Sequence, residues 1–388
     1  MPSKHKKILV NALSARQGGG QTYVINLLKF LPKECSLEIL VLAQDSLLLP
    51  MDSDKIKKLS LASFLANPFV RFLWERWRLP QLLRKTNSNV LFCTGGSVAC
   101  RPPVNCKSVT MFRNMMPFDL KQRRRYRFGY TRFRFWALRR TLLRTMSEAD
   151  LVICLSKYAK GVLKEQSQVA PEKIAVIPHG IPPSFRRSPL ASAPKPSWLP
   201  AVDYILYVSN IDHYKAQIEV IQAFAMMKKA QKHACKLVLV GPAYPPYLKR
   251  VLREINRLGL ATDVVVKGAI PYQEMPGLYQ NALVNIFASE CENCPNILLE
   301  AMAAGRPLLV SNRPPMPEFA GDAAIYFDPR DPKDLASKLS SLLDDSVMMT
   351  DLAQRALLRS ELYDWQCTAD ATWKAIEDLC QESTTLLA

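Results

Sequence analysis

Two α/β domains, each wound around a parallel sheet, are the fold class that this sequence predicts, and three observations lead to it. Short apolar runs alternate with longer segments of helical periodicity, which is the pattern of parallel strands joined by crossover helices. The 388 residues exceed the usual single-domain size of roughly 100–200 residues. Between the two series, residues 182–200 are rich in Pro, Ser and Ala and show no period, as is typical of a linker. We predict an N-terminal domain (1–181), the linker, a C-terminal domain (201–364) and a final helix (365–388) that packs back on the N-terminal domain.

Apolar runs that read as strands occur in both halves of the chain. In the first half they are ILVNAL (8–13), LEILVLA (37–43), NVLFCT (89–94), SVTMF (108–112), LVICLS (151–156) and KIAVIP (173–178). In the second half they are YILYVSN (204–210), KLVLVGP (236–242), DVVVKGAI (263–270), LVNIFAS (283–289), PLLVSN (307–312) and AAIYFD (323–328). Open parallel sheets bind ligands beyond the carboxyl ends of their strands, so functional residues are expected just after these runs.

The charge of the chain is concentrated in one half. Residues 1–200 contain 34 Lys and Arg against 11 Asp and Glu, whereas residues 201–388 contain 18 against 23. The net charge of +18 therefore comes from the first half alone. Such a bias indicates an anionic partner for that half, which can be nucleic acid, an anionic membrane surface or a phosphorylated substrate.

Cysteine placement and hydropathy indicate a reducing compartment. The ten cysteines lie mostly inside apolar runs, as small buried side chains do, and the single C-x-x-C, Cys291 and Cys294, has no second pair at zinc-site spacing. We therefore expect no metal site.

The N-terminal apolar run is too short for a signal peptide, and no run reaches the roughly 18 apolar residues of a membrane span. A cytoplasmic protein is expected, with any membrane contact peripheral.

The segment ASECENCPNILLEAMAAGRPLLVS, after the run LVNIFAS, contains the strongest local pattern. Pro295 suits the first turn of a helix, Gly305 its C-terminal cap, and Pro307 prevents continuation. Glu292 precedes this short helix and Glu300 lies inside it. Because an ionised Glu in a largely apolar helix is costly without partners, Glu300 is expected to meet polar groups of a ligand, although solvated surface carboxylates remain the alternative.

The pair Glu292 and Glu300, followed by AMAAGRP, resembles the signature of the GT-B retaining glycosyltransferases of family 4. Matching segments extend over nearly the whole chain in the order that the family has. They are the Gly18–Gly20 loop, ADLVICLSKYAKGVL (149–163), KIAVIPHGI (173–181), YILYVSNIDHYKAQIEVIQAF (204–224), KLVLVGP, VVVKGAIPYQEMPGLYQNALVNIFAS and YDWQCTADATW (363–373). The resemblance implies two Rossmann-like domains whose parallel sheets face each other across a cleft that holds a nucleotide-sugar donor.

Roles for individual residues follow from the resemblance. Lys215 corresponds to the lysine that binds the donor diphosphate, and Glu292 to the residue that hydrogen-bonds hydroxyls of the transferred sugar; both are the predicted catalytic residues. Glu300 corresponds to the residue that holds the ribose. The loop of Gly18, Gly19 and Gly20 would close on the donor phosphate, although a simple tight turn is the alternative.

The chain departs from the family pattern at two places near the predicted donor site. Many relatives have Gly-Arg where this chain has Ser209 and Asn210, so one positive contact to the donor phosphate is lost, while Asn210 can still donate a hydrogen bond. Many relatives also have Gly-Phe-Gly-Leu where this chain has residues 293–296. Backbone donors remain at Cys294, Asn296 and Ile297, so donor binding is expected but donor identity is left open.

Acceptor residues are less well defined. Arg113 and Asn114 follow the strand SVTMF, on the side where the family binds its acceptor. His179 and His213 can line the cleft, with a structural role for His179 and a surface role for His213 as alternatives.

The resemblance implies front-face transfer, in which the leaving phosphate accepts the proton of the incoming hydroxyl. Such a reaction needs no protein nucleophile, and we expect neither a cofactor nor a metal; the donor would be UDP- or GDP-linked. Cell-surface polysaccharide or lipopolysaccharide synthesis on a glycan or lipid-linked acceptor is the expected setting. A nucleotide-sugar epimerase of the same fold and a basic nucleic-acid-binding protein are the alternatives, although no nucleic-acid reader motif is present and no nucleic acid is expected as a partner.

Residues 121–144 (KQRRRYRFGYTRFRFWALRRTLLR) contain nine arginines, one lysine and no acid, with aromatic residues between them. This composition predicts docking on an anionic membrane at the cytoplasmic face, helped by residues 69–85. The arginines assigned to this surface or to the acceptor are Arg123, Arg124, Arg125 and Arg127. A solvated helix and binding of a lipid-linked diphosphate are the alternatives.

Overall fold

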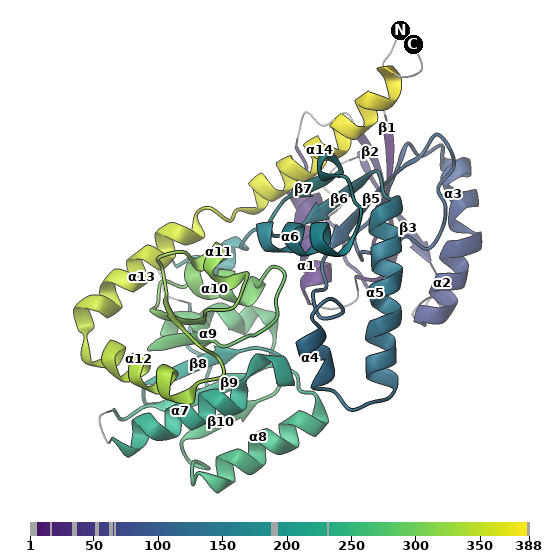
Figure 1. Cartoon of the computed structure of the whole chain (residues 1–388). Coiled ribbons are helices and arrows are strands. Elements are labelled where there is room, and N and C mark those ends of the chain that lie inside the picture. The colour runs from purple at the N-terminus through teal and green to yellow at the C-terminus, as the bar shows by residue number, and fades with distance from the viewer. Residues whose placement is uncertain are drawn as a thin grey trace. The chain divides into compact units, whose positions relative to one another are not determined.

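One parallel sheet lies inside each of the two units that make up the computed structural model of the chain (Figure 1). Unit 1 comprises Met1–Phe118, Phe128–Gly180 and Trp365–Ala388, and unit 2 comprises Asp119–Arg127 and Ile181–Asp364. The structure describes residues 6–15, 18–32, 37–50, 54–61, 65, 67–187, 193–230 and 233–385. The prediction of two Rossmann-like α/β domains is confirmed, whereas the placement of their sheets across a cleft stays a prediction.

The sheet of unit 1 has seven strands in the order β3-β2-β1-β4-β5-β6-β7, and all neighbours are parallel. The strands are β1 (Lys6–Asn11), β2 (Leu37–Gln44), β3 (Ile56–Leu61), β4 (Val90–Cys93), β5 (Lys107–Phe112), β6 (Leu151–Cys154) and β7 (Ile174–Val176). The apolar runs predicted six of them and missed β3, IKKLSL. Because β3 is an edge strand in which Ile56 alone is buried, it has no apolar run to recognise.

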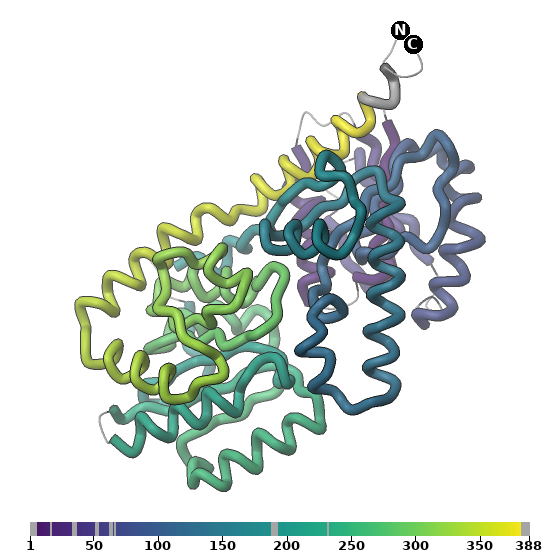
Figure 2. The backbone as a smooth tube through the Cα atoms, in the orientation of Figure 1, coloured from purple at the N-terminus to yellow at the C-terminus, as the bar shows by residue number. Residues whose placement is uncertain are grey.

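Helices surround this sheet, and the last helix of the chain completes the unit. They are α1 (Gly19–Lys29), α2 (Pro68–Trp77), α3 (Leu79–Thr86), α5 (Tyr130–Glu148), α6 (Lys157–Gln166), the short η2 (Pro171–Lys173) and α14 (Trp365–Thr385). Helix α14 packs on α1, where Trp373 Nε1 donates to the carbonyl of Leu27 at 3.1 Å. Its far end comes close to the first strand (Figure 2), and Lys6 Nζ donates to the carbonyl of Cys380.

The sheet of unit 2 has six parallel strands in the order β10-β9-β8-β11-β12-β13. They are β8 (Tyr204–Val208), β9 (Lys236–Val240), β10 (Val264–Lys267), β11 (Val284–Phe287), β12 (Leu308–Ser311) and β13 (Ile325–Phe327). Each corresponds to a predicted apolar run. One continuous cluster of buried apolar side chains, from Ile181 to Tyr363, forms the core of the unit.

The helices of unit 2 pack in two groups (Figure 1). One group is α7 (Gln217–Lys229), α8 (Pro245–Arg257) and α12 (Pro332–Asp344), and the other is α9 (Met275–Asn281), α10 (Asn296–Ala303), α11 (Met316–Ala320) and α13 (Ser346–Ser360). Short turns of helix also occur at η3 (Pro183–Phe185), η4 (His213–Lys215) and η5 (Tyr272–Glu274).

The boundaries of the units differ from the predicted ones at two places. Helix α4 (Leu120–Arg124) was expected in the N-terminal domain, but its contacts place the segment Asp119–Arg127 in unit 2. The predicted linker is partly built into the same unit, because Phe185 is buried in its core. Residues 188–192 of that linker and 386–388 of the final helix lie outside the described residues.

No helix within the described residues is long and apolar enough to cross a bilayer.

Candidate functional site

The candidate site of unit 2 lies where the strand order reverses. The chain runs outward from the central strand β8 to β9 on one side and later to β11 on the other, so β8 and β11 are neighbours. Open parallel sheets bind ligands beyond the carboxyl ends of such a pair of strands. Ser209 and Asn210 follow β8 directly. Gln217 of α7 fixes this turn, because its Nε2 donates to Ser209 Oγ at 2.9 Å and to the carbonyl of Asn210 at 2.8 Å. The predictions did not include Gln217.

Lys215, at the end of η4, is buried and forms an ion pair with Glu292. The hydroxyl of Tyr207, on β8, donates to the Lys215 carbonyl at 2.6 Å and so ties this turn to the sheet. Burial lowers the pKa of Lys215, but Glu292 and Tyr214 outweigh it and leave the pKa raised. The ammonium group therefore stays charged at neutral pH and can attract an anion.

The residue after Lys215 has an unusual backbone. Ala216 has φ 52° and ψ 35°, in the left-handed region that a residue with a side chain seldom occupies. Such conformations cost of order 1–3 kcal/mol and persist where the surroundings enforce them, which is frequent at functional sites. At this position the turn lets helix α7 begin directly after Lys215.

The loop after β11 presents Glu292, and helix α10 follows it. Pro295 takes the N-cap position of this helix and Gly305, with φ +60°, follows its end, so both helix limits agree with the predicted signals. The sequence predicts that backbone N–H groups of Cys294, Asn296 and Ile297 are available to a nucleotide-sugar donor in this segment. The N–H of Asn296 donates to the Cys294 carbonyl at 3.0 Å, within the loop itself, and Ile297 packs in part against the core.

Glu300 lies inside α10 and is buried. Two tyrosines that the predictions did not include contact its carboxylate: Tyr272 donates to Oε1 at 2.9 Å and Tyr279 to Oε2 at 3.4 Å. Burial raises the pKa of Glu300 to about 7, and the two tyrosine hydrogen bonds only partly oppose this. The carboxylate thus has one hydroxyl donor on each oxygen, an arrangement that also suits the two hydroxyls of a ribose.

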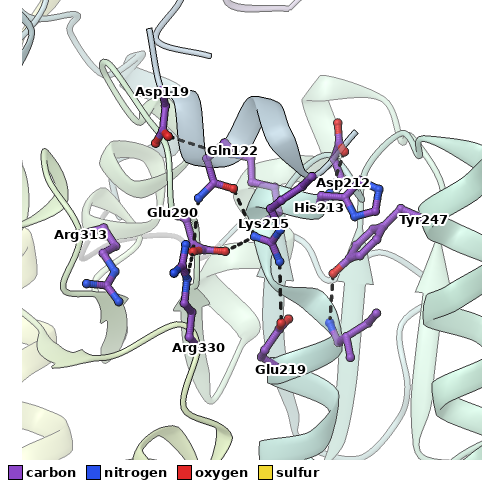
Figure 3. Close-up of polar contacts among 12 residues, drawn as sticks. Asp119, Gln122, Asp212, His213, Lys215, Glu219, Tyr247, Glu290, Arg313 and Arg330 are labelled. Carbon is purple, nitrogen blue, oxygen red and sulfur yellow. Dashed lines mark hydrogen bonds and ion pairs between the residues drawn. The ribbon is translucent and has the colours of Figure 1, made fainter. Parts of the chain in front are cut away.

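A second carboxylate of the loop between β11 and α10, Glu290, was not predicted. It is buried, and its two oxygens accept hydrogen bonds from three side chains: Arg125, Arg330 at 2.5 Å and Gln122 at 3.3 Å. Figure 3 shows Gln122 and Arg330 reaching Glu290 from different elements. The carboxylate stands two residues before Glu292, and its partners are too distant in sequence for a motif to reveal them.

His213 shares η4 with Lys215 and lies among the rings of Tyr126, Tyr244 and Tyr247, at centroid distances of 5.4, 6.0 and 4.7 Å. Burial lowers the pKa of His213, which favours the neutral imidazole. His179 belongs to unit 1, where its ring packs on Tyr23 at 5.1 Å.

The remaining predicted residues of unit 1 lie at the corresponding edge of its own sheet. Gly18 has φ +59° and precedes α1, whose first two residues are Gly19 and Gly20. Arg113, beyond β5, donates to the Thr94 carbonyl at 3.3 Å, and its guanidinium lies over the Tyr23 ring at 5.5 Å.

The four predicted arginines of the basic run lie in the segment that unit 2 includes. Arg124 and Arg127 are exposed, and Arg123 is partly buried. Arg125 pairs with Glu290 and approaches Glu219 at 4.0 Å, so its charge is directed into unit 2.

Unit 2 thus brings Lys215 and Glu292 into direct contact and places Ser209 and Asn210 on the neighbouring turn. Within the described part of the chain, no group of three or more His, Cys, Asp or Glu side chains is arranged to hold a metal ion.

Curated relatives of the chain are glycosyltransferases. The chain is 24% identical over 282 residues to the serotype-specific mannosyltransferase WbdA of Escherichia coli, a match that covers 71% of the chain and 34% of that protein. The chain therefore spans about a third of the length of this relative. It is also 24% identical to the O-antigen chain mannosyltransferase B of Escherichia coli, over 60% of the chain and 61% of that protein.

Solved structures share the fold of the whole chain. Sucrose-phosphate synthase from Thermosynechococcus elongatus matches 96% of the chain and 99% of its own with a TM-score of 0.74 at 17% identity. WaaG, a glycosyltransferase involved in lipopolysaccharide biosynthesis, matches 95% and 99% with a TM-score of 0.70 at 14% identity.

Two family models together match most of the sequence. The model of glycosyltransferase family 4 matches residues 17–185, and the model of glycosyl transferases group 1 matches residues 196–359. The first covers most of the strands of unit 1, and the second includes Lys215, Glu292 and Glu300. The chain therefore belongs to the glycosyltransferases of family 4, also described as group 1.

Proposed function

We propose that this protein is a retaining hexosyltransferase that moves a sugar from a UDP- or GDP-linked donor to a glycan or lipid-linked acceptor. The observation that carries the proposal is the buried ion pair of Lys215 and Glu292 beyond the adjacent ends of β8 and β11. Membership of the family makes a donor site at this position the expected use of the pair.

The proposed transfer forms no covalent bond between the sugar and the protein. The bond between the anomeric carbon and the donor phosphate breaks as the acceptor oxygen bonds to that carbon on the same face. The proton of the acceptor hydroxyl passes to the leaving phosphate. Lys215 stabilises the charge that develops on the diphosphate, while Glu292 accepts hydrogen bonds from the sugar and Glu300 from the ribose. In this proposal neither a metal nor a cofactor takes part.

Mannose is the first sugar to test, because the names of two relatives describe mannosyl transfer, one of them in O-antigen synthesis. The transfer would then contribute to a cell-surface polysaccharide or a lipopolysaccharide. GDP-mannose and UDP-glucose are the two donors to compare, and binding of GDP against UDP separates a guanine from a uracil site.

A nucleotide screen followed by product analysis tests this function. One of UDP, GDP or their sugars should raise the melting temperature of the protein, and the matching sugar should be transferred with its anomeric configuration kept, as NMR of the product reports. Inversion of the configuration would contradict the retaining mechanism. Interconversion of the free nucleotide sugar without acceptor would instead favour the epimerase alternative.

We further propose that unit 1 docks on an anionic membrane at the cytoplasmic face. Large apolar side chains are exposed on two of its segments. They are Phe69, Phe72, Leu73 and Trp77 on α2, Phe128 just before α5, and Tyr130, Phe133 and Trp136 in the first half of α5. Arginines alternate with these rings in both segments. Rings of this kind favour the headgroup boundary, and each basic residue near an anionic surface adds roughly 1 kcal/mol.

The arginines of unit 1 that take part in this second proposal are those of α5. Arg123, Arg124 and Arg127 lie in unit 2, and their contribution to membrane binding stays a prediction. Arg125 is left out because its guanidinium pairs with Glu290. Cosedimentation with liposomes tests the proposal: binding should rise with the fraction of anionic lipid and fall with salt. Equal recovery in the supernatant with and without anionic lipid would contradict it.

A further inference from the structure

The segment Asp119–Arg127 belongs to unit 2 by its contacts, although the chain before and after it belongs to unit 1. Its short helix α4 begins at Leu120, and Asp119 caps that helix by accepting from the N–H of Gln122 at 3.0 Å. The next residues, Arg125 and Tyr126, reach the two loops of unit 2 that carry the Lys215 and Glu292 pair.

Arg125 contacts the loop of Glu292 through Glu290. Its guanidinium pairs with the Glu290 carboxylate, which Arg330 and Gln122 also contact. The Glu290 side chain is 2% exposed, so these partners take the place of water around its carboxylate. The N–H of Glu290 also donates to the carbonyl of Tyr214 at 2.8 Å, directly before Lys215.

Tyr126 contacts the loop of Lys215. Its hydroxyl donates to Asp212 Oδ1 at 2.9 Å, and the same oxygen accepts the N–H of His213 at 2.7 Å. Asp212 is the N-cap of η4, whose last residue is Lys215. Arg125 and Tyr126 therefore each contact one loop of the site. Arg125 binds the loop that carries Glu292, and Tyr126 binds the loop that carries Lys215; these two side chains form the ion pair.

We propose that the segment Asp119–Arg127 acts as a clamp on the donor site, with Arg125 and Tyr126 as positioning residues for Glu292 and Lys215. This inference rests on the proposed function. Arg125 has a second, electrostatic effect in this arrangement. Together with Arg330 it compensates the charge of Glu290 and adds positive charge beside the site that would receive an anionic diphosphate.

The electrostatic effect makes the clamp testable by rescue. Arg125→Gln leaves Glu290 with one fewer cation, and we expect kcat/KM for the nucleotide-sugar donor to fall about tenfold, as for directly coupled residues. Glu290→Gln in the Arg125→Gln protein restores the net charge of the cluster of Arg125, Arg330 and Glu290, so the double variant should recover part of the lost kcat/KM. Assays use GDP-mannose and UDP-glucose with release of the nucleoside diphosphate as the readout.

A binding cycle tests the contact of Tyr126. Tyr126→Phe removes a single hydroxyl and keeps the ring. It should weaken the binding of UDP and GDP, measured by calorimetry, by about fivefold, since a single hydrogen bond contributes roughly 1 kcal/mol. If Tyr126 acts through Lys215, the same change in a Lys215→Ala protein should have no further effect. A purely structural role would give the same loss in both backgrounds.

Arg355→Gln is the matched control, because Arg355 also forms ion pairs in unit 2, with Asp351 at 2.7 Å and Asp322 at 3.8 Å. Its kinetic constants should equal those of the wild type. Wild-type constants in both Arg125→Gln and Tyr126→Phe would overturn the clamp while leaving the proposed function intact. A wild-type protein that binds none of the nucleotides would instead remove the proposed function.

Discussion

Arginines of one basic run have opposite surroundings in the two units. In unit 1 they lie beside exposed rings, with Arg132 over Phe128 at 5.5 Å and Arg140 over Trp136 at 5.2 Å. In unit 2, Arg125 contacts the buried carboxylate of Glu290. The difference teaches that a basic composition does not define one function: the exposed arginines can meet an external anionic surface, whereas the paired arginine acts on its own unit.

The largest effects are expected in unit 2, at the residues that would meet the donor. Lys215→Ala, Glu292→Ala and Glu300→Ala should each lower the rate of sugar transfer by about 100-fold or more, because each removes a preorganised charged contact. Initial rates with saturating donor and circular dichroism of each variant measure activity and folding. Rates near that of the wild type in folded variants would contradict the assignment of the donor site.

A second effect in unit 2 follows from the pKa of Glu300, about 7. Because this pKa is raised by burial, the protonated carboxyl stabilises the fold below the ordinary pKa of Glu, and this contribution is lost as the pH rises toward 7. The ribose hydroxyls require an acceptor, so donor affinity should show the opposite trend and be about tenfold weaker at pH 6 than at pH 8.

Calorimetry with an intact nucleotide sugar measures this effect, since its phosphates carry no second ionisation near pH 6. Glu300→Gln should remove the dependence on pH. A dependence that persists in this variant would assign the titration to another group.

A smaller effect, on membrane binding, is expected from the solvent-exposed aromatic side chains of unit 1. Replacing Phe133 and Trp136 by Ser should weaken binding to anionic liposomes by about fivefold while leaving transfer to a soluble acceptor unchanged. Leu358, which is also exposed but lies in unit 2, offers the control Leu358→Ser. If this control loses as much binding as the double variant, the docking surface is not confined to unit 1.

The smallest effect is expected from chelation. Activity should be unchanged in EDTA, because in the proposed reaction the charged Lys215 supplies the positive charge that a metal would otherwise bring to the diphosphate. Loss of turnover that magnesium or manganese restores would show this prediction wrong.

The sequence predicted most of the fold because buried parallel strands are nearly continuous apolar runs. The exception among the described strands, β3, has an exposed face and lies at the edge of its sheet. The limits of helix α10 were also predictable, since Pro295 and Gly305 act on the backbone locally.

The environment of the site was harder to predict because it depends on contacts between distant segments. Glu290 lies in the same loop as Glu292, but Arg125 is 165 positions away and no motif joins them. Tyr272 and Tyr279 contact Glu300 from a different helical segment. The roles of Lys215, Glu292 and Glu300 stay predictions that rest on the family.

The return of α14 to unit 1 has a consequence for the order in which the chain is made. Trp365 packs against the ring of Tyr23 in α1, and Trp373 donates a hydrogen bond to the carbonyl of Leu27 in the same helix. Lys6 Nζ donates to the carbonyl of Cys380. A ribosome therefore finishes every residue of unit 2 before it supplies the helix that covers α1. Until then, unit 1 exposes the apolar surface that α14 will cover, so a nascent chain or a fragment ending at residue 364 is expected to require a chaperone.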